Sequence, residues 1–388
     1  MKKFVSLLLC ASMALAAAGC GASGQAAAAS SAALASGTEG LAYTLLPGDV
    51  KTPVTGNGAK IALVVDSGGL ADSANNAAAW DGVQKFCRNF GFTAQSFVAA
   101  DASVQGAEDA LRAAAESGAG LVVCMGAGLE TPLYDLQGNY PTVSFLMLDG
   151  EPHTEDYATY ETGNATHCVL FREEQAGYLA GYAAVADGST LLGFAGSETM
   201  PGIVRYGTGF LQGAQAAAEL NGAQVTIRYW FSGAYESAED VTDRLSGWYA
   251  DGTQLVFACG GTMAASCTAA AQQSGGKVIA SDYDQSALGG AVVSSAVKAV
   301  SRAAQNTLYA FYANGGSWGT DGAGQTEQLG VSAGAVALTT ANWNFVTFTR
   351  QKYETLYGQL LEGKIKVGRY SDMNALPETQ NVAVDLQT

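Results

Sequence analysis

The sequence predicts an α/β protein built from two doubly wound, Rossmann-like lobes. From Lys60 onward, short apolar runs alternate with stretches of helical period, a pattern typical of parallel strands that helices cover on both faces. The pattern restarts near Glu173, so we expect one sheet in each half of the chain. Of the 388 residues, 48% are hydrophobic and 49 are glycine, which favours compact cores joined by tight turns.

In the first half, apolar runs bounded by glycine, aspartate or other polar residues predict strands at 61–65, 93–98, 121–125 and 143–148. The helix after the first strand places Trp80, Val83, Phe86 and Phe90 at spacings of three and four, and Gly91 ends it. A further helix is expected around 107–116.

In the second half, the same pattern predicts helices at 173–186 and 204–220 and strands at 191–195, 225–230, 255–258 and 278–280. Glycine and short polar segments interrupt the pattern near 168–171, 284–290 and 328, where we expect the chain to cross between lobes. The first lobe would then comprise 59–170 plus 286–328, and the second 171–285 plus 329–388.

The amino terminus has the pattern of a bacterial lipoprotein export signal. Two lysines precede an apolar run of about 15 residues, too short to span a bilayer, and small residues then precede Cys20. We expect 1–19 to be a cleaved signal peptide, Cys20 to carry lipid, and 20–58 to be a flexible tether. This would hold the protein on the extracytoplasmic face of the cell membrane. The alternative is an ordinary secretory signal in which Cys20 is incidental.

Charge and composition exclude several functions. A net charge of −16 argues against binding to nucleic acid or to an anionic membrane surface. Outside the export signal the chain has five cysteines without regular spacing, no CxxC pair, and only His153 and His167. A zinc site or a thiol redox centre is therefore not expected, and neither is a cofactor.

Polar residues and glycines follow several of the predicted strands. In a doubly wound sheet the carboxyl ends of the strands form the ligand site, and a carboxylate there can accept hydrogen bonds from neighbouring hydroxyls of a sugar or nucleoside. Any one aspartate could instead cap the next helix or turn. Because these residues occur in both halves, a binding cleft is the better interpretation for the set: Asp66, Asp149, Gly196, Gly260, Gly261, Asp282 and Asp284.

Several motifs, in order, resemble the basic membrane protein family, the nucleoside-binding lipoproteins of ABC-type importers. The resemblance covers most of 60–370, and its segments are IALVVDSGGLADSANNAAAWDGVQKF (61–86), NYPTVSFLMLDG (139–150), FREEQAGYLAG (171–181), GFAGSETMPGIVRYGTGFLQGAQAA (193–217), SDYDQSALGGAVVSSAVK (281–298) and LEGKIKV (361–367). It implies a type I periplasmic-binding-protein fold that closes by a hinge on a nucleoside. It also implies an ABC permease and ATPase as partners and a monomeric receptor.

The resemblance assigns ligand contacts to ten positions of this chain. In the family these residues surround ribose hydroxyls and the edge of a base. A Phe usually stands where this chain has Asn75, and in the family that ring stacks on the base. A second ring could come from 229–237, where Tyr235 fits best, although core packing explains its neighbours Trp230 and Phe231 equally well. The ten are Asp66, Asn75, Asn76, Asp149, Tyr235, Gly260, Gly261, Asp282, Asp284 and Lys298.

Two other classes of function remain open at this stage. Doubly wound sheets also support enzymes, but the chain has no GxGxxG after its first strand, no P-loop, no GxSxG and no histidine-centred triad. We therefore expect a binding protein rather than an enzyme. A receptor that signals to a membrane kinase would have the same sequence features as a transport receptor.

Overall fold

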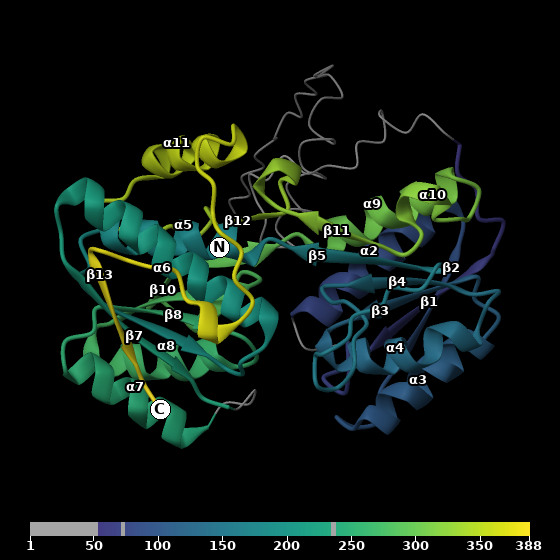
Figure 1. The fold of residues 1–388 in the computed structure, drawn as a ribbon, viewed down its shortest axis with the longest axis horizontal. Coiled ribbons are helices and arrows are strands. Elements are labelled where there is room, and N and C mark those ends of the chain that lie inside the picture. Colours follow the sequence, from purple (N-terminus) through teal and green to yellow (C-terminus); the bar gives the residue numbers. More distant parts are fainter. Residues whose placement is uncertain (1–52, 71–73, 234–237) are drawn as a thin grey trace, which may run out of the picture.

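Two sheets organise the chain in the computed structural model, which describes residues 53–70, 74–233 and 238–388 (Figure 1). The first sheet has the order β11-β5-β4-β3-β1-β2, and all its paired strands are parallel. Its strands are β1 (Lys60–Val65), β2 (Thr93–Val98), β3 (Leu121–Met125), β4 (Ser144–Leu148), β5 (Thr166–Phe171) and β11 (Gln325–Leu329).

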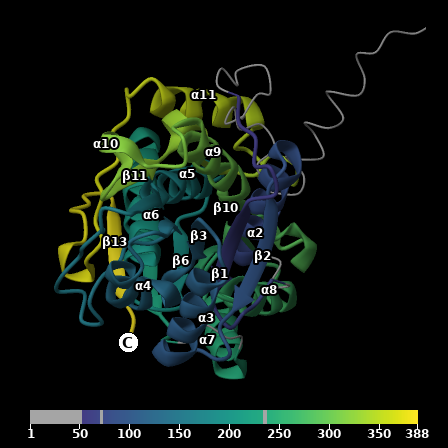
Figure 2. The same cartoon turned by 90° about the vertical axis from the view of Figure 1, so that its right-hand side faces the viewer.

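Helices cover both faces of this first sheet. One face packs against α2 (Asn75–Phe90) and α9 (Val300–Ala313), and the other against α3 (Val104–Glu116) and α4 (Glu130–Leu136). Successive residues of β1 therefore enter different cores, which is why the strand is apolar throughout rather than alternating. Figure 2 shows α9 and α3 on opposite sides of β1. The short helix α10 (Gly319–Gly322) leads into β11.

The second sheet has the order β12-β10-β9-β8-β6-β7-β13, with only β12 antiparallel to its neighbour. One face packs against α5 (Glu173–Ala186) and α6 (Pro201–Asn221), and the other against α7 (Glu239–Ala250) and α8 (Met263–Ser274). The last helix is α11 (Arg350–Leu361). The strands are β6 (Leu191–Gly196), β7 (Val225–Phe231), β8 (Leu255–Cys259), β9 (Lys277–Asp282), β10 (Val292–Lys298), β12 (Val336–Leu338) and β13 (Val382–Leu386).

The chain passes between the two sheets three times. It leaves the first sheet after β5, returns from β10 into α9, and leaves again between β11 and β12. The second crossing thus follows Lys298 and does not fall at 284–290 as the sequence suggested. The segment 286–298 was expected in the first lobe, but β10 pairs with β9 in the second sheet. An apolar strand carries no local signal for the sheet it joins, which explains the error.

The predicted α/β class with parallel sheets is confirmed. None of the helices in the described ranges is long and apolar enough to cross a membrane. Cys20 and the predicted tether up to residue 52 lie outside the described residues.

Candidate functional site

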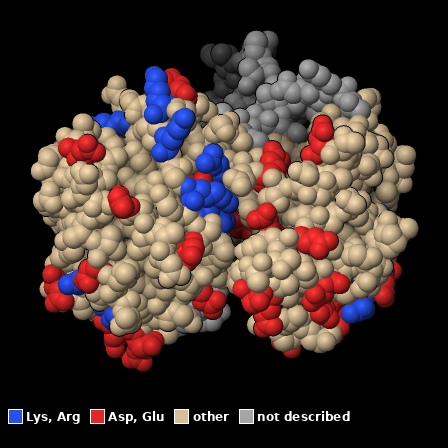
Figure 3. Space-filling view, viewed as in Figure 1, with Lys and Arg blue, Asp and Glu red and all other residues tan. Residues whose placement is uncertain are grey.

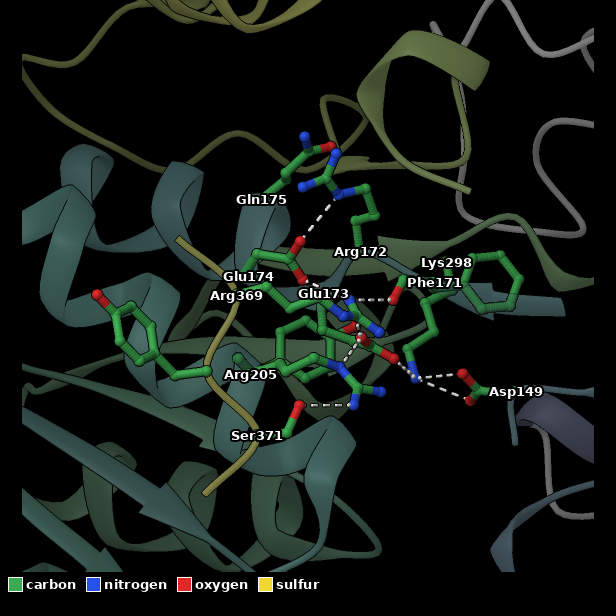
Figure 4. A network of polar contacts seen from close by, with 12 residues as sticks. Asp149, Phe171, Arg172, Glu173, Glu174, Gln175, Arg205, Lys298, Arg369 and Ser371 are labelled. Carbon is green, nitrogen blue, oxygen red and sulfur yellow. Dashed lines mark hydrogen bonds and ion pairs between the residues drawn. The ribbon is translucent and has the colours of Figure 1, made fainter. Parts of the chain in front are cut away.

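Lys298, at the end of β10, joins the carboxyl ends of strands from both lobes (Figure 4). Its Nζ lies 2.8 Å and 3.1 Å from the two carboxylate oxygens of Asp149, which follows β4 in the first sheet. The same Nζ lies 3.2 Å from Oδ1 of Asp282, at the end of β9 in the second sheet. The side chain of Lys298 is only 6% exposed, so this ion pair between the lobes is shielded from water. The expectation that strand-end acids of both halves converge is met by Asp149 and Asp282.

Both aspartates that contact Lys298 have left-handed backbone. The φ angle is +60° at Asp149 and +70° at Asp282, a region that non-glycine residues rarely adopt. Such strain costs on the order of 1 kcal/mol or more and persists mainly where the surrounding structure needs it, often at ligand sites. The strand ends are therefore shaped to turn these carboxylates toward Lys298.

Ionisation in this cluster is strongly perturbed. Burial raises the pKa of Asp149 to about 7, with the Glu173 and Asp282 carboxylates adding to the effect and Lys298 opposing it. Burial alone would lower the pKa of Lys298, but Asp149, Asp282 and Glu173 together raise it well above its ordinary value. Lys298 is thus a permanent cation, whereas Asp149 can gain or lose a proton near neutral pH.

A buried ion pair between Glu173 and Arg205, which was not predicted from the sequence, packs against Lys298 and its two aspartates. Glu173, the first residue of α5, is fully buried, and its Oε2 accepts a 2.7 Å bond from Nε of Arg205 on α6. Its other oxygen lies 3.4 Å from Nζ of Lys298. Burial would raise the pKa of Glu173, but Arg205 and Lys298 outweigh it and hold the pKa at about 2. The sequence offered a clue to this pair, because two adjacent glutamates stand in the otherwise mostly apolar segment FREEQAGYLAG.

The second of these glutamates, Glu174, binds the carboxyl-terminal segment through Arg369 next to the Glu173 ion pair. Glu174 is fully buried and pairs with Arg369 at 2.8 Å and with Arg172 at 2.9 Å. Arg369 Nη1 also donates to the carbonyl of Phe171, the residue where the chain leaves the first sheet. In Figure 3, basic side chains gather at the upper end of the groove between the lobes, with acidic side chains beside them.

A second group of predicted residues comes together at the end of β1. Oδ1 of Asp66 accepts 2.9 Å hydrogen bonds from the side-chain amide of Asn76 and from the backbone of Gly68. A side chain at Gly126, after β3, would lie 3.3 Å from Oδ2 of Asp66, and the φ of +98° there also favours glycine. Asn75 is the first residue of α2 and is half-buried.

The remaining predicted residues have varied surroundings. Gly260 donates its backbone N–H to Ser281 Oγ at 3.3 Å, and Gly261 follows it with a φ of +51°. Asp284 accepts a 3.0 Å bond from the backbone of Ser286, which is a local turn contact away from Lys298. Tyr235 lies outside the described residues. Trp230 is buried between Trp248 and Arg244, so core packing accounts for its ring.

The site offers hydrogen-bond acceptors and a fixed, shielded cation between the two lobes. These groups suit a small polar ligand with several hydroxyls. No three His, Cys, Asp or Glu side chains in the described ranges are grouped in a way that could hold a metal ion. All five cysteines in those ranges are buried.

Two mainly parallel sheets joined by three crossings give the fold of the periplasmic-binding-protein type. A solute-binding protein of an ABC transporter system from Aeropyrum pernix K1 matches with a TM-score of 0.65 at 19% identity, over 81% of this chain and 95% of that one. One from Conexibacter woesei DSM 14684 matches with a TM-score of 0.62 at 19% identity, over 81% of this chain and all of that one. At these identities the likeness establishes the fold.

The chain belongs to the Bmp family, described as PnrA-like substrate-binding proteins of ABC transporters, whose family model matches residues 59–368. The resemblance stated from the sequence is thereby confirmed, as is the expectation of a binding protein rather than an enzyme.

Two curated relatives are 25% identical to parts of the chain. The nucleoside-binding protein BmpA of Lactococcus lactis matches over 222 residues, 55% of this chain and 57% of its own length. A CD4+ T-cell-stimulating antigen of Listeria monocytogenes matches over 208 residues, 52% of this chain and 55% of its own length. The chain therefore spans little more than half the length of the curated relatives it matches.

Proposed function

We propose that the protein is a lipid-anchored receptor that captures a nucleoside and presents it to an ABC permease and its ATPase. The observation that carries the proposal is the contact of Lys298 with Asp149 and Asp282 across the two lobes. A ribose brings vicinal hydroxyls that can donate to such carboxylates and accept from such an ammonium. The nucleoside specificity of the L. lactis relative supports the same ligand class.

The mechanism is closure of the lobes around the ligand without covalent chemistry. Three segments cross between the sheets, and bending in them would let the lobes swing together. Because Lys298 already pairs with carboxylates of both lobes, a ligand hydroxyl must enter or displace this ion pair. We propose a monomer, since one chain contains both halves of the cleft.

Calorimetric titration of the full chain with purine and pyrimidine nucleosides tests the proposal. Asp282→Ala should weaken binding about ten- to a hundredfold, because it removes a desolvated polar contact beside Lys298. Asp251→Ala removes a largely exposed aspartate of the second lobe and should change nothing, which makes it the matched control. Free ribose should bind far more weakly than a nucleoside. Absence of binding by any nucleoside would refute the ligand class.

A signalling receptor is the remaining alternative in function. Uptake of labelled nucleoside by cells with and without the gene separates the two. Loss of uptake supports transport, whereas unchanged uptake together with tight binding by the purified protein supports sensing.

A further inference from the structure

A small hairpin between β4 and β5 presents two exposed aromatic rings beside the cleft. Residues 152–161 form it, with a backbone bridge between His153 and Tyr160 and a hydrogen bond from Glu161 N to the carbonyl of Pro152. At its tip, Thr154 N donates to the carbonyl of Thr159 at 2.9 Å. The hairpin is therefore a defined, hydrogen-bonded unit rather than a loose connection.

The hairpin is fixed to the same row of strand ends that forms the cleft. It begins three residues after Asp149, and Oε1 of Glu130, at the start of α4, accepts the backbone N–H of Glu151 at 2.9 Å. Oε2 of Glu130 lies 3.2 Å from Nε2 of His153, whose other ring nitrogen lies 2.7 Å from the carbonyl of Thr154. His153 is 4% exposed, so this contact anchors the hairpin from within.

His153 in turn positions the two rings. Tyr157 stacks on it with ring centroids 4.1 Å apart, and Tyr160 lies at 5.2 Å. Their outer surfaces are free, because Tyr157 is 41% and Tyr160 is 49% exposed. The φ of +56° at Tyr157 is strained for a non-glycine residue, and such strain tends to be retained at ligand sites.

Charged groups of the second lobe lie near enough to affect both rings. Burial raises the pKa of Tyr157, and Glu130, Tyr160 and Glu198 of the second lobe raise it further. Burial and the Glu130 and Glu151 carboxylates raise the pKa of Tyr160, while Arg205 of the second lobe opposes them. Arg205 pairs with Glu173, which contacts Lys298, and the hairpin itself starts three residues after Asp149, another partner of Lys298, so it lies beside this cluster.

We propose that Tyr157 and Tyr160 form the aromatic surface on which the flat base of the ligand stacks. This inference rests on the proposed function and adds the residues that select for a base. The rings nearest Lys298 in the described ranges, Phe171 and Tyr206, are buried and cannot offer a face to a ligand. Asn75 offers hydrogen bonds but no ring, whereas the hairpin has exposed aromatic area.

Calorimetric titration of the full chain with guanosine, adenosine, uridine and free ribose tests this inference. Tyr157→Ala and Tyr160→Ala should each weaken nucleoside binding about tenfold, because base–aromatic stacking is of that size. Tyr157→Phe and Tyr160→Phe should bind within about twofold of wild type, since the ring remains. Affinity for free ribose should be the same in all variants. Tyr140→Ala is the matched control, because Tyr140 precedes β4 at the opposite end of the strand, beside Glu116.

Each other outcome overturns the inference in a distinguishable way. Wild-type nucleoside affinity in both alanine variants would overturn it and leave the proposed function intact. Equal losses for ribose and nucleosides, without rescue by phenylalanine, would show a structural role for the hairpin. Normal binding with failed uptake in cells would assign the rings to the permease instead. No nucleoside binding by the wild-type protein would overturn both the inference and the proposed function.

Discussion

The carboxylate of Asp149 lies near one cation, Lys298, and two further acids, Glu173 and Asp282, so its protonation changes the charge of this cluster. Its pKa is raised to about 7, chiefly by burial, and it contacts Lys298 directly. An ionised Asp149 accepts hydrogen bonds from ligand hydroxyls, whereas the protonated form has lost part of that capacity. We therefore predict that this residue couples ligand binding to pH in the neutral range.

We predict that nucleoside affinity rises with pH up to about pH 7 and is then constant. Below that value a proton competes with the ligand, and affinity should fall by up to about tenfold per pH unit. Titrations from pH 5 to 8 in buffers of different ionisation enthalpy should show protons released on binding. Asp149→Asn should bind more weakly and without this pH dependence. A profile that is flat in the wild-type protein would contradict the assignment.

The same group predicts the direction of a stability change in the ligand-free protein. Because its folded pKa lies above the unfolded value of 3.8, the folded chain keeps a proton that the unfolded chain loses between about pH 4 and 7. This group alone therefore makes the protein less stable as pH rises through that window. Urea unfolding of wild type and Asp149→Asn at pH 5 and 7 measures the difference, which should shrink in the variant.

At the scale of elements, helices α5 and α6 pack unusually close because glycines face each other. A side chain at Gly181 would lie 2.0 Å from the carbonyl oxygen of Phe210, and one at Gly177 would lie 2.1 Å from that of Tyr206. The reverse also holds, since Gly209 and Gly213 of α6 meet backbone carbonyls of α5. This close approach places Glu173 of α5 against Arg205 of α6, so helix packing builds the support of the cleft.

Gly181→Ala should destabilise the protein by about 3 kcal/mol, because backbone rather than a flexible side chain must move. Gly247→Ala is the matched control, since Gly247 lies in helix α7 with no atom within 4 Å of the added methyl group. It should leave stability unchanged or raise it by up to about 1 kcal/mol, through helix propensity. Urea midpoints at unchanged slope measure both. A urea midpoint of Gly181→Ala equal to that of the wild type would contradict the close packing of α5 against α6.

The buried pair of Glu173 and Arg205 should show strong coupling. Arg205→Met leaves a buried carboxylate without its main partner and should cost about 3–5 kcal/mol. Glu173→Gln combined with Arg205→Met should cost less than the sum of the single variants, because no unpaired charge remains. Unfolding free energies of the four proteins test this, and additive costs would show that the pair is not coupled.

At the scale of the whole molecule, three chain crossings join the two lobes. The ion pairs of Lys298 with Asp149 and Asp282 connect the lobes as well. The first described residue is 53, so lipid on Cys20, as we propose, would leave more than 30 residues between the membrane and the two lobes. We expect such a spacer to separate any movement of the lobes from the anchor. Anchoring and ligand binding should therefore be separable.

We predict that Cys20→Ser leaves the protein uncleaved or released from cells, with unchanged nucleoside affinity in the purified protein. Fractionation of cells and the mass of the mature chain check the first part, and calorimetry checks the second. Membrane attachment and processing like those of the wild type would mean that Cys20 carries no lipid.

Much of this architecture follows from residue patterns alone. Apolar runs such as KIALVV and LVVCM predicted strands buried on both faces, because only such strands are apolar at every position. Polar residues at the ends of the predicted strands led to the expectation that several of them converge, and Asp149 and Asp282 do so at Lys298. The apolar spacing around Phe86 and the glycine at 91 also predicted helix α2 correctly. Such patterns depend only on neighbours within one or two helical turns.

Other features arise only from contacts between distant parts of the chain. The sheet that β10 joins, the pairing of Glu173 with Arg205 and the anchoring of His153 by Glu130 each bring together residues on separate elements. Local sequence determined the elements and their order, because propensity and periodicity act over a few residues. The tertiary structure decided which charges are paired and which rings remain exposed, because burial and electrostatics depend on neighbours that the order of residues does not reveal.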